Sequence, residues 1–206
     1  MVLLKRFALG GSVLGTCTVF ACSSSSTPHS GSVRVLVGTV DGTDAQVAVV
    51  AAAHRARIYF CGGGSSYPAL THWFTADVDA SGAIRAYADA LGDWSIEGQV
   101  GGADAAGAVT VADGTRLTFR ATSVAGGTIA GLYEAAAPCG KVGLIVTQPS
   151  AQAAPSGQGA CIHTDVRPSV EQVNPIAPLI RATDGTIRVL VAGTAAALSV
   201  LPAAAP

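Results

Sequence analysis

Trp73 and His72 are the side chains whose type and position could bind a ligand. Apolar and polar residues alternate over residues 70–78, which places His72 with Leu70 and Phe74 on the apolar side and Trp73 on the polar side. An exposed indole ring could stack on a sugar or a peptide. Because tryptophan is highly buried on average, the favoured alternative is that another strand or the C-terminal segment covers Trp73.

A run of acidic and small residues imitates a calcium-binding loop. Asp77, Asp79 and Ser81 at alternate positions, followed by Gly82, match the first half of an EF-hand loop. The twelfth position, where a bidentate glutamate should close the site, is Ala88. A turn explains the same residues, since Asp and Ser accept backbone hydrogen bonds and Gly adopts a positive φ. We therefore predict a turn here, and neither a metal site nor a cofactor.

Groups that could support catalysis are scattered. Residues 62–66 form a glycine–serine loop, but it lacks both the G-x-S-x-G nucleophile elbow and the lysine of a phosphate-binding loop. His54, His72 and His163 could each act as a base, yet none has a recognisable nucleophile partner. No catalytic residue is predicted. A hydrolase stays an alternative, which the convergence of His72 or His163 with a carboxylate in one cleft would favour.

The first 21 residues have the pattern of a signal peptide. Lys5 and Arg6 form a positively charged start, and residues 7–21 are uncharged and apolar. A stable membrane-spanning helix needs about 20 predominantly apolar residues, so this stretch is too short to be one.

The end of the signal, Val19-Phe20-Ala21-Cys22, resembles the lipobox of bacterial lipoproteins. The resemblance implies cleavage before Cys22 and attachment of a diacylglyceryl group to its sulfur. Residues 22–32 are serine-rich and read as a flexible tether. Ser23 stands where an aspartate would retain a lipoprotein in the inner membrane, so the resemblance implies sorting to the outer membrane. The alternative is an ordinary secretory signal with an unmodified cysteine.

Export would permit disulfide bonds among the remaining cysteines. We predict a Cys139–Cys161 disulfide across a long loop, which leaves Cys61 as a buried free thiol. Connectivity cannot be read from sequence, and Cys61–Cys139 is the main alternative. Zinc is not expected, because no C-x₂-C pair or histidine cluster accompanies these residues.

From residue 33 onward the hydrophobic pattern has a period of two, and turn signals recur about every ten residues. Asp-Gly dipeptides between apolar runs are typical of tight hairpins. The expected strands cover residues 33–40, 47–50, 57–61, 70–78, 83–88, 94–100, 108–111, 116–121, 129–134 and 142–147, with 161–163 and 186–191 as later strands.

This rhythm predicts an all-β fold, an antiparallel meander closed as a barrel, with a β-sandwich as the alternative. We expect a single β-domain over residues 33–206, in which residues 149–185 form a proline-rich loop or extended segment. The strand 94–100 alternates and should be half buried. Residues 47–50 and 144–146 are apolar on both faces, so they should be central strands or strands covered by another layer.

Residues 33–147 also resemble a β-meander domain found behind lipoprotein signals in uncharacterised exported proteins of high-GC bacteria. The matching motifs combine glycine turns with apolar positions: Val47-Ala48-Val49-Val50, Tyr59-Phe60-Cys61-Gly62, Trp73-Phe74, Gly131-Leu132-Tyr133-Glu134 and Gly143-Leu144-Ile145-Val146. The resemblance implies a fold and a location in the cell envelope, and it assigns no activity.

Composition excludes some functions. Half of the 206 residues are hydrophobic and 12% are charged, which excludes an intrinsically disordered chain. A formal net charge of −1 provides no electrostatic footprint for nucleic acid. We expect a lipid-anchored cell-envelope protein with a non-catalytic β-domain, structural or bound to an envelope protein or glycan. The alternative is a lipocalin-like binder of a small apolar ligand, which an open apolar cavity of roughly 300 Å³ or more would favour.

Overall fold

Strands are the main regular elements of the part of the chain that the structure describes. This computed structural model describes residues 32–87, 94–163, 169–191 and 197–204. The predicted signal peptide, Cys22 and all but the last residue of the predicted tether lie outside these ranges. Within them, no helix is long and apolar enough to cross a membrane.

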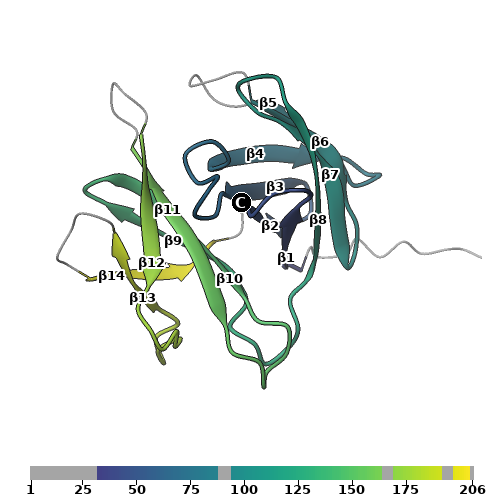
Figure 1. The fold of residues 1–206 in the computed structure, drawn as a ribbon. Helices are drawn as coiled ribbons and strands as arrows, with labels where there is room; N and C mark the ends of the chain where they lie inside the picture. The colour runs from purple at the N-terminus through teal and green to yellow at the C-terminus, as the bar shows by residue number, and fades with distance from the viewer. Residues whose placement is uncertain (1–31, 88–93, 164–168, 192–196, 205–206) are drawn as a thin grey trace, which may run out of the picture.

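The first eight strands form a closed antiparallel barrel, which confirms the predicted meander (Figure 1). Each strand pairs with the next, and β8 returns to pair with β1 from Leu36–Ser123 to Val40–Phe119. The strands are β1 (Arg34–Val40), β2 (Gln46–Ala51), β3 (Arg55–Cys61), β4 (His72–Val78), β5 (Ala83–Tyr87), β6 (Ser95–Val100), β7 (Asp104–Thr110) and β8 (Arg116–Ser123).

Glycine allows the backbones of this barrel to approach closely at β1. A methyl group at Gly38 would run into the backbone of Arg120 and Ala121 on β8. Only a residue without a Cβ fits where β1 and β8 close the sheet.

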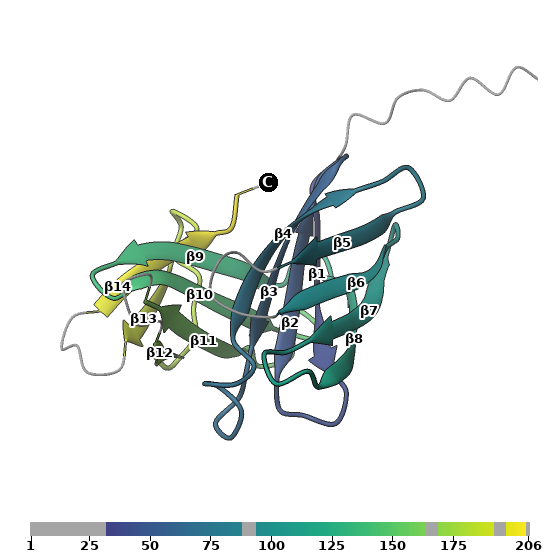
Figure 2. The same cartoon turned by 90° about the horizontal axis from the view of Figure 1, so that it is seen from above.

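A second antiparallel sheet follows a seven-residue connection and lies beside the barrel in both Figure 1 and Figure 2. Its strands are β9 (Gly131–Ala137), β10 (Gly140–Thr147), β11 (Ser156–Ile162), β12 (Val170–Pro175), β13 (Ile187–Val191) and β14 (Ala197–Pro202). The sheet curls and closes where β14 pairs with β9 at Leu201–Glu134 and Pro202–Tyr133, and the Ala203 N–H donates to the Leu132 carbonyl just beyond them. Two closed sheets therefore occupy the range in which the sequence predicted one barrel.

The range 149–185, predicted as a proline-rich loop or extended segment, contains paired strands. Strands β11 and β12 lie within that range, and β12 pairs with β11 from Gly159–Val173 to Ile162–Val170. Pro175 ends β12, where its missing N–H removes no internal ladder bond. Only the end of β11 was expected, within residues 161–163, because glycine, glutamine and proline obscure the alternation of apolar residues in the rest of these strands.

Side chains fill the interior of the first barrel. Phe60 makes edge-to-face contacts with Phe74 and with Phe119, at centroid distances of 5.9 Å and 5.4 Å. Leu36 and Ile58 are fully buried among them. The predicted half-buried strand is confirmed, since Ile96 and Val100 point into this core while Gln99 is exposed.

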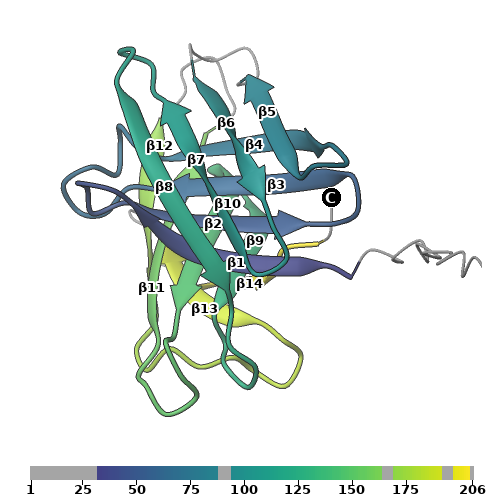
Figure 3. The same cartoon turned by 90° about the vertical axis from the view of Figure 1, so that its right-hand side faces the viewer.

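A third apolar cluster lies between the two sheets, and it explains the strands that are apolar on both faces. On β2, Val47 and Val49 point into the barrel, while Ala48 and Val50 pack against the second sheet. On β10 of the second sheet, Ile145 points into this third cluster, away from the apolar core inside its own sheet. In Figure 3 the first barrel faces the viewer and the second sheet lies behind it. The predicted covering layer is the second sheet.

Candidate functional site

Trp73 lies at the seam between the two sheets, where side chains of both sheets pack against its indole ring. One face stacks on Tyr59 of β3, with ring centroids 4.3 Å apart. The Lys141 ammonium of β10 lies over the ring, 3.8 Å from its centroid. The alternative that another layer covers Trp73 is therefore confirmed. These contacts already use ring surface on which a sugar or peptide would stack.

His72 lies on the opposite face of β4, so the structure does not bring the two predicted ligand contacts together. Its ring stacks on Trp94 at 4.8 Å and meets the edge of Phe74 at 5.0 Å, at the inner face of the first barrel. Successive residues of a strand point to opposite faces, which separates adjacent side chains into different environments.

Three charged residues join the two sheets beside Trp73. The Arg57 guanidinium of β3 pairs with Oε1 of Glu134 on β9, and the Lys141 ammonium lies 3.2 Å from Oε2 of the same carboxylate. The side chains of Arg57 and Glu134 are 24% and 21% exposed. Partial burial reduces the screening by water that weakens exposed pairs, so this network orients β9 and β10 on β3 more firmly than a surface ion pair would.

Gly143 of β10 makes room for the aromatic stack. A Cβ at this position would lie 2.5 Å from Cζ of Tyr59 and 2.8 Å from Cζ2 of Trp73. The Tyr59 hydroxyl reaches the carbonyl oxygens of Gly143 and Ala160 at 3.5 Å and 3.4 Å, the outer limit of a hydrogen bond. Burial raises the pKa of Tyr59 well above its ordinary value, so the phenol stays neutral.

A hollow of about 490 Å³ lies beside this network. Among the described side chains it is lined by Glu134, Ala135, Ala136, Gly140 and Lys141. Its walls therefore combine one carboxylate and one ammonium with small apolar groups. The pairing of β9 with β14 covers Tyr133 and Glu134, so the hollow lies where this ladder ends.

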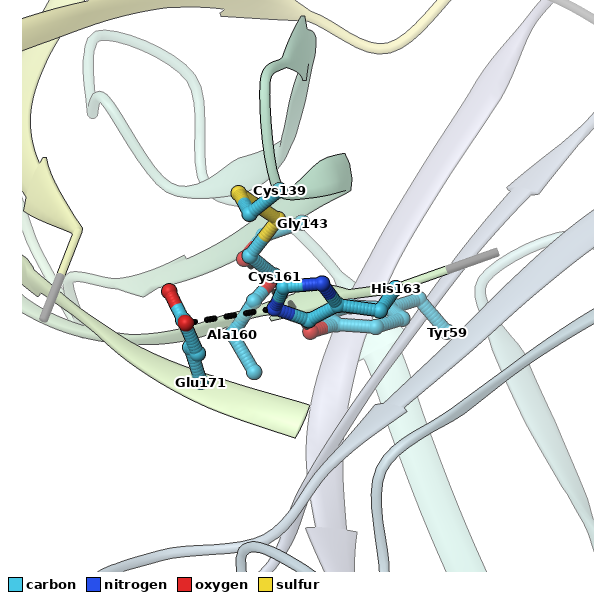
Figure 4. The surroundings of a disulfide bond; sticks show 7 residues. All are labelled: Tyr59, Cys139, Gly143, Ala160, Cys161, His163 and Glu171. Carbon is cyan, nitrogen blue, oxygen red and sulfur yellow. Dashed lines mark hydrogen bonds and ion pairs between the residues drawn. A yellow bond between two sulfur atoms is a disulfide. The ribbon is translucent and has the colours of Figure 1, made fainter. Parts of the chain in front are cut away.

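The cysteine prediction is confirmed. Cys139 and Cys161 form a disulfide with a Cα–Cα distance of 6.3 Å, shown in Figure 4. Cys61 is a buried free thiol, so the alternative pairing of Cys61 with Cys139 is wrong. Burial raises the pKa of the Cys61 thiol to about 11, which keeps it protonated and unreactive at neutral pH.

His163 lies beside a carboxylate, which is one part of what the hydrolase alternative requires, but neither residue of the pair lines a hollow described for this chain. Its Nε2 lies 3.2 Å from Oε1 of Glu171, across the β11–β12 ladder (Figure 4), without the geometry of a hydrogen bond. The sulfur nearest along the chain, in Cys161, is held in the disulfide and is not a nucleophile. The pair supplies a base with its orienting acid but no activated nucleophile.

The glycine–serine loop after β3 is occupied by an anion of the chain itself. The Asp44 carboxylate accepts hydrogen bonds from the backbone N–H groups of Gly63 and Ser65 and from the hydroxyls of Ser65 and Ser66. These donors hold the pKa of Asp44 well below its ordinary value. The donors that a phosphate or an oxyanion would need are already engaged.

The segment that imitates a calcium loop is a turn, as predicted. The Asp79 carboxylate accepts from the N–H groups of Ser81 and Ala83, and Gly82 has a φ of 86°. The Ser81 hydroxyl also donates to this carboxylate, and it contributes most to holding the pKa of Asp79 below its ordinary value, with the N–H bonds adding to it. In the described ranges, no three His, Cys, Asp or Glu side chains cluster closely enough to hold a metal ion.

A wider hollow of about 790 Å³ lies on the outer face of the first barrel, away from the second sheet. Glu97 pairs there with Arg85 and with Arg116, and all three side chains are at least 46% exposed. Exposed ion pairs of this kind are typical of a solvated surface and contribute little to stability or binding.

The charged network at the seam was not predicted from the sequence. The available signal was Glu134, a charged residue in the otherwise apolar stretch of residues 131–137, together with Arg57 at the start of an apolar run. Such residues need a partner when the strand is covered, but the partners lie on different sheets and 77 positions apart. No family model, no curated protein and no solved structure matches this chain, so the site stands on its own geometry.

Proposed function

We propose that the protein is a lipid-anchored component of a bacterial cell envelope, held by an acyl-modified Cys22. Its body of two sheets is non-catalytic and acts as a structural or protein-binding unit. The lipobox-like end of the signal and the serine-rich stretch after it support the anchor. Dual acylation holds a protein on a membrane durably, whereas a single chain does so only marginally.

The Cys139–Cys161 disulfide is the single structural observation that supports export. Disulfides persist in oxidising compartments and are rare in the cytosol of most organisms. Cys161 is fully buried, so the disulfide is a structural cross-link rather than an exposed redox centre.

The tether would keep the body close to the membrane. The ten residues 23–32 span at most roughly 35 Å when fully extended, and about 17 Å as a flexible coil. The first barrel would therefore begin within roughly 35 Å of the lipid surface, with the Arg34 end of β1 nearest the anchor. Outer-membrane sorting is part of the proposal, because Ser23 replaces the aspartate of inner-membrane retention.

Metabolic labelling with a fatty acid tests the anchor. The unaltered protein should incorporate label and fractionate with the outer membrane, and Cys22→Ala should do neither. Cys17→Ala is the matched control, since it removes the other cysteine of the signal and should leave labelling intact. Equal labelling of the unaltered chain and Cys22→Ala would exclude lipidation at Cys22.

Two other functions have less support. A lipocalin-like binder would need room inside the barrel, whereas fully buried Phe60, Phe119 and Leu36 occupy the interior of β1–β8. A hydrolase has the His163–Glu171 pair in its favour. Hydrolysis of ester or peptide substrates that disappears in His163→Gln would support the hydrolase.

A further inference from the structure

We propose that the hollow beside Lys141 binds a small monoanionic carboxylate that carries a short apolar chain. This inference goes beyond the proposed function and does not rest on it, because binding at Lys141 and labelling at Cys22 are measured separately.

The charges of the seam point to an anion. Arg57 and Lys141 carry two positive charges and share one carboxylate, that of Glu134. Both carboxylate oxygens are engaged, so Glu134 has no further oxygen to offer. The Lys141 ammonium has three N–H donors and lies over Trp73. Its contact with the Glu134 carboxylate uses at most one or two of these donors. Its side chain is 39% exposed and borders the hollow, where an incoming oxygen could accept a remaining proton.

The net charge of Arg57, Lys141 and Glu134 limits the ligand to one negative charge. The three side chains sum to +1, which a carboxylate neutralises. A phosphate monoester near −2 would leave a surplus negative charge beside Glu134, at the cost of like-charge repulsion in a partly desolvated site.

The remaining walls determine the body of the ligand. Ala135, Ala136 and Gly140 present methyl groups and backbone, which favour a short aliphatic chain over a polar one. The hollow, at about 490 Å³, lies within the usual range of small-molecule sites. A ligand whose carboxylate contacts Lys141 and whose alkyl chain packs on the two alanines would match both the charged and the apolar wall of the hollow.

Butyrate tests the inference, and Trp73 reports on it. The chain contains two tryptophans, and Trp73 Nε1 is buried with no hydrogen-bond partner among the described residues. In the ¹⁵N-labelled full chain, butyrate should shift the Trp73 indole resonance saturably, with a Kd of roughly 1–10 mM. The Trp94 resonance in the barrel core should stay in place as an internal reference. Butanol, which lacks the charge, and acetate, which lacks the chain, should each bind at least tenfold more weakly.

Variants separate the site from a general effect of salt. Lys141→Met keeps an unbranched chain over Trp73 and should lose the butyrate response, whereas Lys141→Arg should keep it. Arg188→Gln removes an exposed cation elsewhere on the second sheet and should leave the response unchanged. Glu134→Gln should tighten binding, because it raises the local charge to +2. The inference is overturned by a butanol shift equal to that of butyrate, by no saturable shift, or by an unchanged response in a folded Lys141→Met chain.

Discussion

Gly143 shows how a single missing methyl group determines the contact between the two sheets. Its position against the rings of Tyr59 and Trp73 leaves no volume for a side chain. We expect Gly143→Ala to lower the free energy of unfolding by about 1–3 kcal/mol, the usual cost of overpacking a dense interface. Urea unfolding followed by tryptophan fluorescence measures the change. Gly126→Ala, in the connection between the sheets with open space around it, is the matched control and should change stability little.

A second prediction for a single residue concerns Asp44 and the dependence of stability on pH. Its pKa lies below the ordinary value of 3.8 in the folded chain, mainly because the Ser65 and Ser66 hydroxyls donate to the carboxylate. A carboxyl group with a depressed folded pKa stabilises the fold above its unfolded pKa, and that stabilisation is lost as the pH falls toward the folded pKa. The stability difference between the unaltered chain and Asp44→Asn should therefore be greatest above about pH 5 and shrink toward about pH 2.

Urea titrations of both chains at several pH values provide the measurement. A difference that stays constant from about pH 6 to about pH 2 would show that the hydrogen bonds do not depend on the charge of Asp44. Amide exchange at Gly63 and Ser65 gives a local check, since these N–H groups should exchange faster in Asp44→Asn.

At the scale of the elements, the disulfide fastens the β9–β10 hairpin to β11. Cys139 lies at the hairpin tip and Cys161 in the neighbouring strand, 22 positions later. Cross-linking a loop of this length restricts the unfolded chain and stabilises the fold by about 3 kcal/mol in the chain-entropy model. The double replacement Cys139→Ser and Cys161→Ser should lose up to this amount, measured as a lower urea midpoint.

Cys61→Ala is the control for that experiment. It removes a buried sulfur without a cross-link and should cost roughly 1 kcal/mol. If Cys61→Ala destabilised the chain as much as the double replacement, the loss would reflect packing rather than the cross-link. Peptide mapping of the unreduced chain should recover Cys139 linked to Cys161.

Strands with strict alternation could be predicted from the sequence, and strands without it could not. The range 94–100 alternates and was expected within one residue of β6. By contrast, β12 contains Glu171, Gln172 and Asn174, and β14 ends on Pro202, so neither has the pattern of a covered strand. β12 is held between its neighbours β11 and β13, and β14 is held between β13 and the distant β9, by pairing that local propensity does not contain.

The candidate site was predictable only in its aromatic part. Trp73 stood out because it broke the alternation of its own strand, and that break marks the surface that the second sheet covers. Lys141, Glu134 and Arg57 come from β10, β9 and β3, and their convergence depends on how two closed sheets dock. No spacing within one strand encodes that geometry.

At the scale of the whole molecule, docking of the sheets accounts for the low charge of the chain. The 12% of charged residues suit a body with three apolar clusters, one inside each sheet and one between them. The outer faces of β2 and β3, which would carry polar side chains in an isolated barrel, are apolar at Ala48, Val50 and Tyr59. Each sheet therefore depends on the other to cover this surface.

Ile145 tests this dependence, because it is fully buried between the sheets rather than inside either one. Ile145→Asp would place an unpaired carboxylate in the third cluster, at a cost of roughly 3 kcal/mol or more. If the sheets then separate, Trp73 loses its stack on Tyr59 and becomes solvent-exposed, while Trp94 stays in the barrel core. Small-angle X-ray scattering should show a larger radius of gyration, and proteolysis should accelerate within residues 124–130. Leu190→Asp, on the exposed face of β13, should change none of these, and equal effects of the two substitutions would argue against mutual covering.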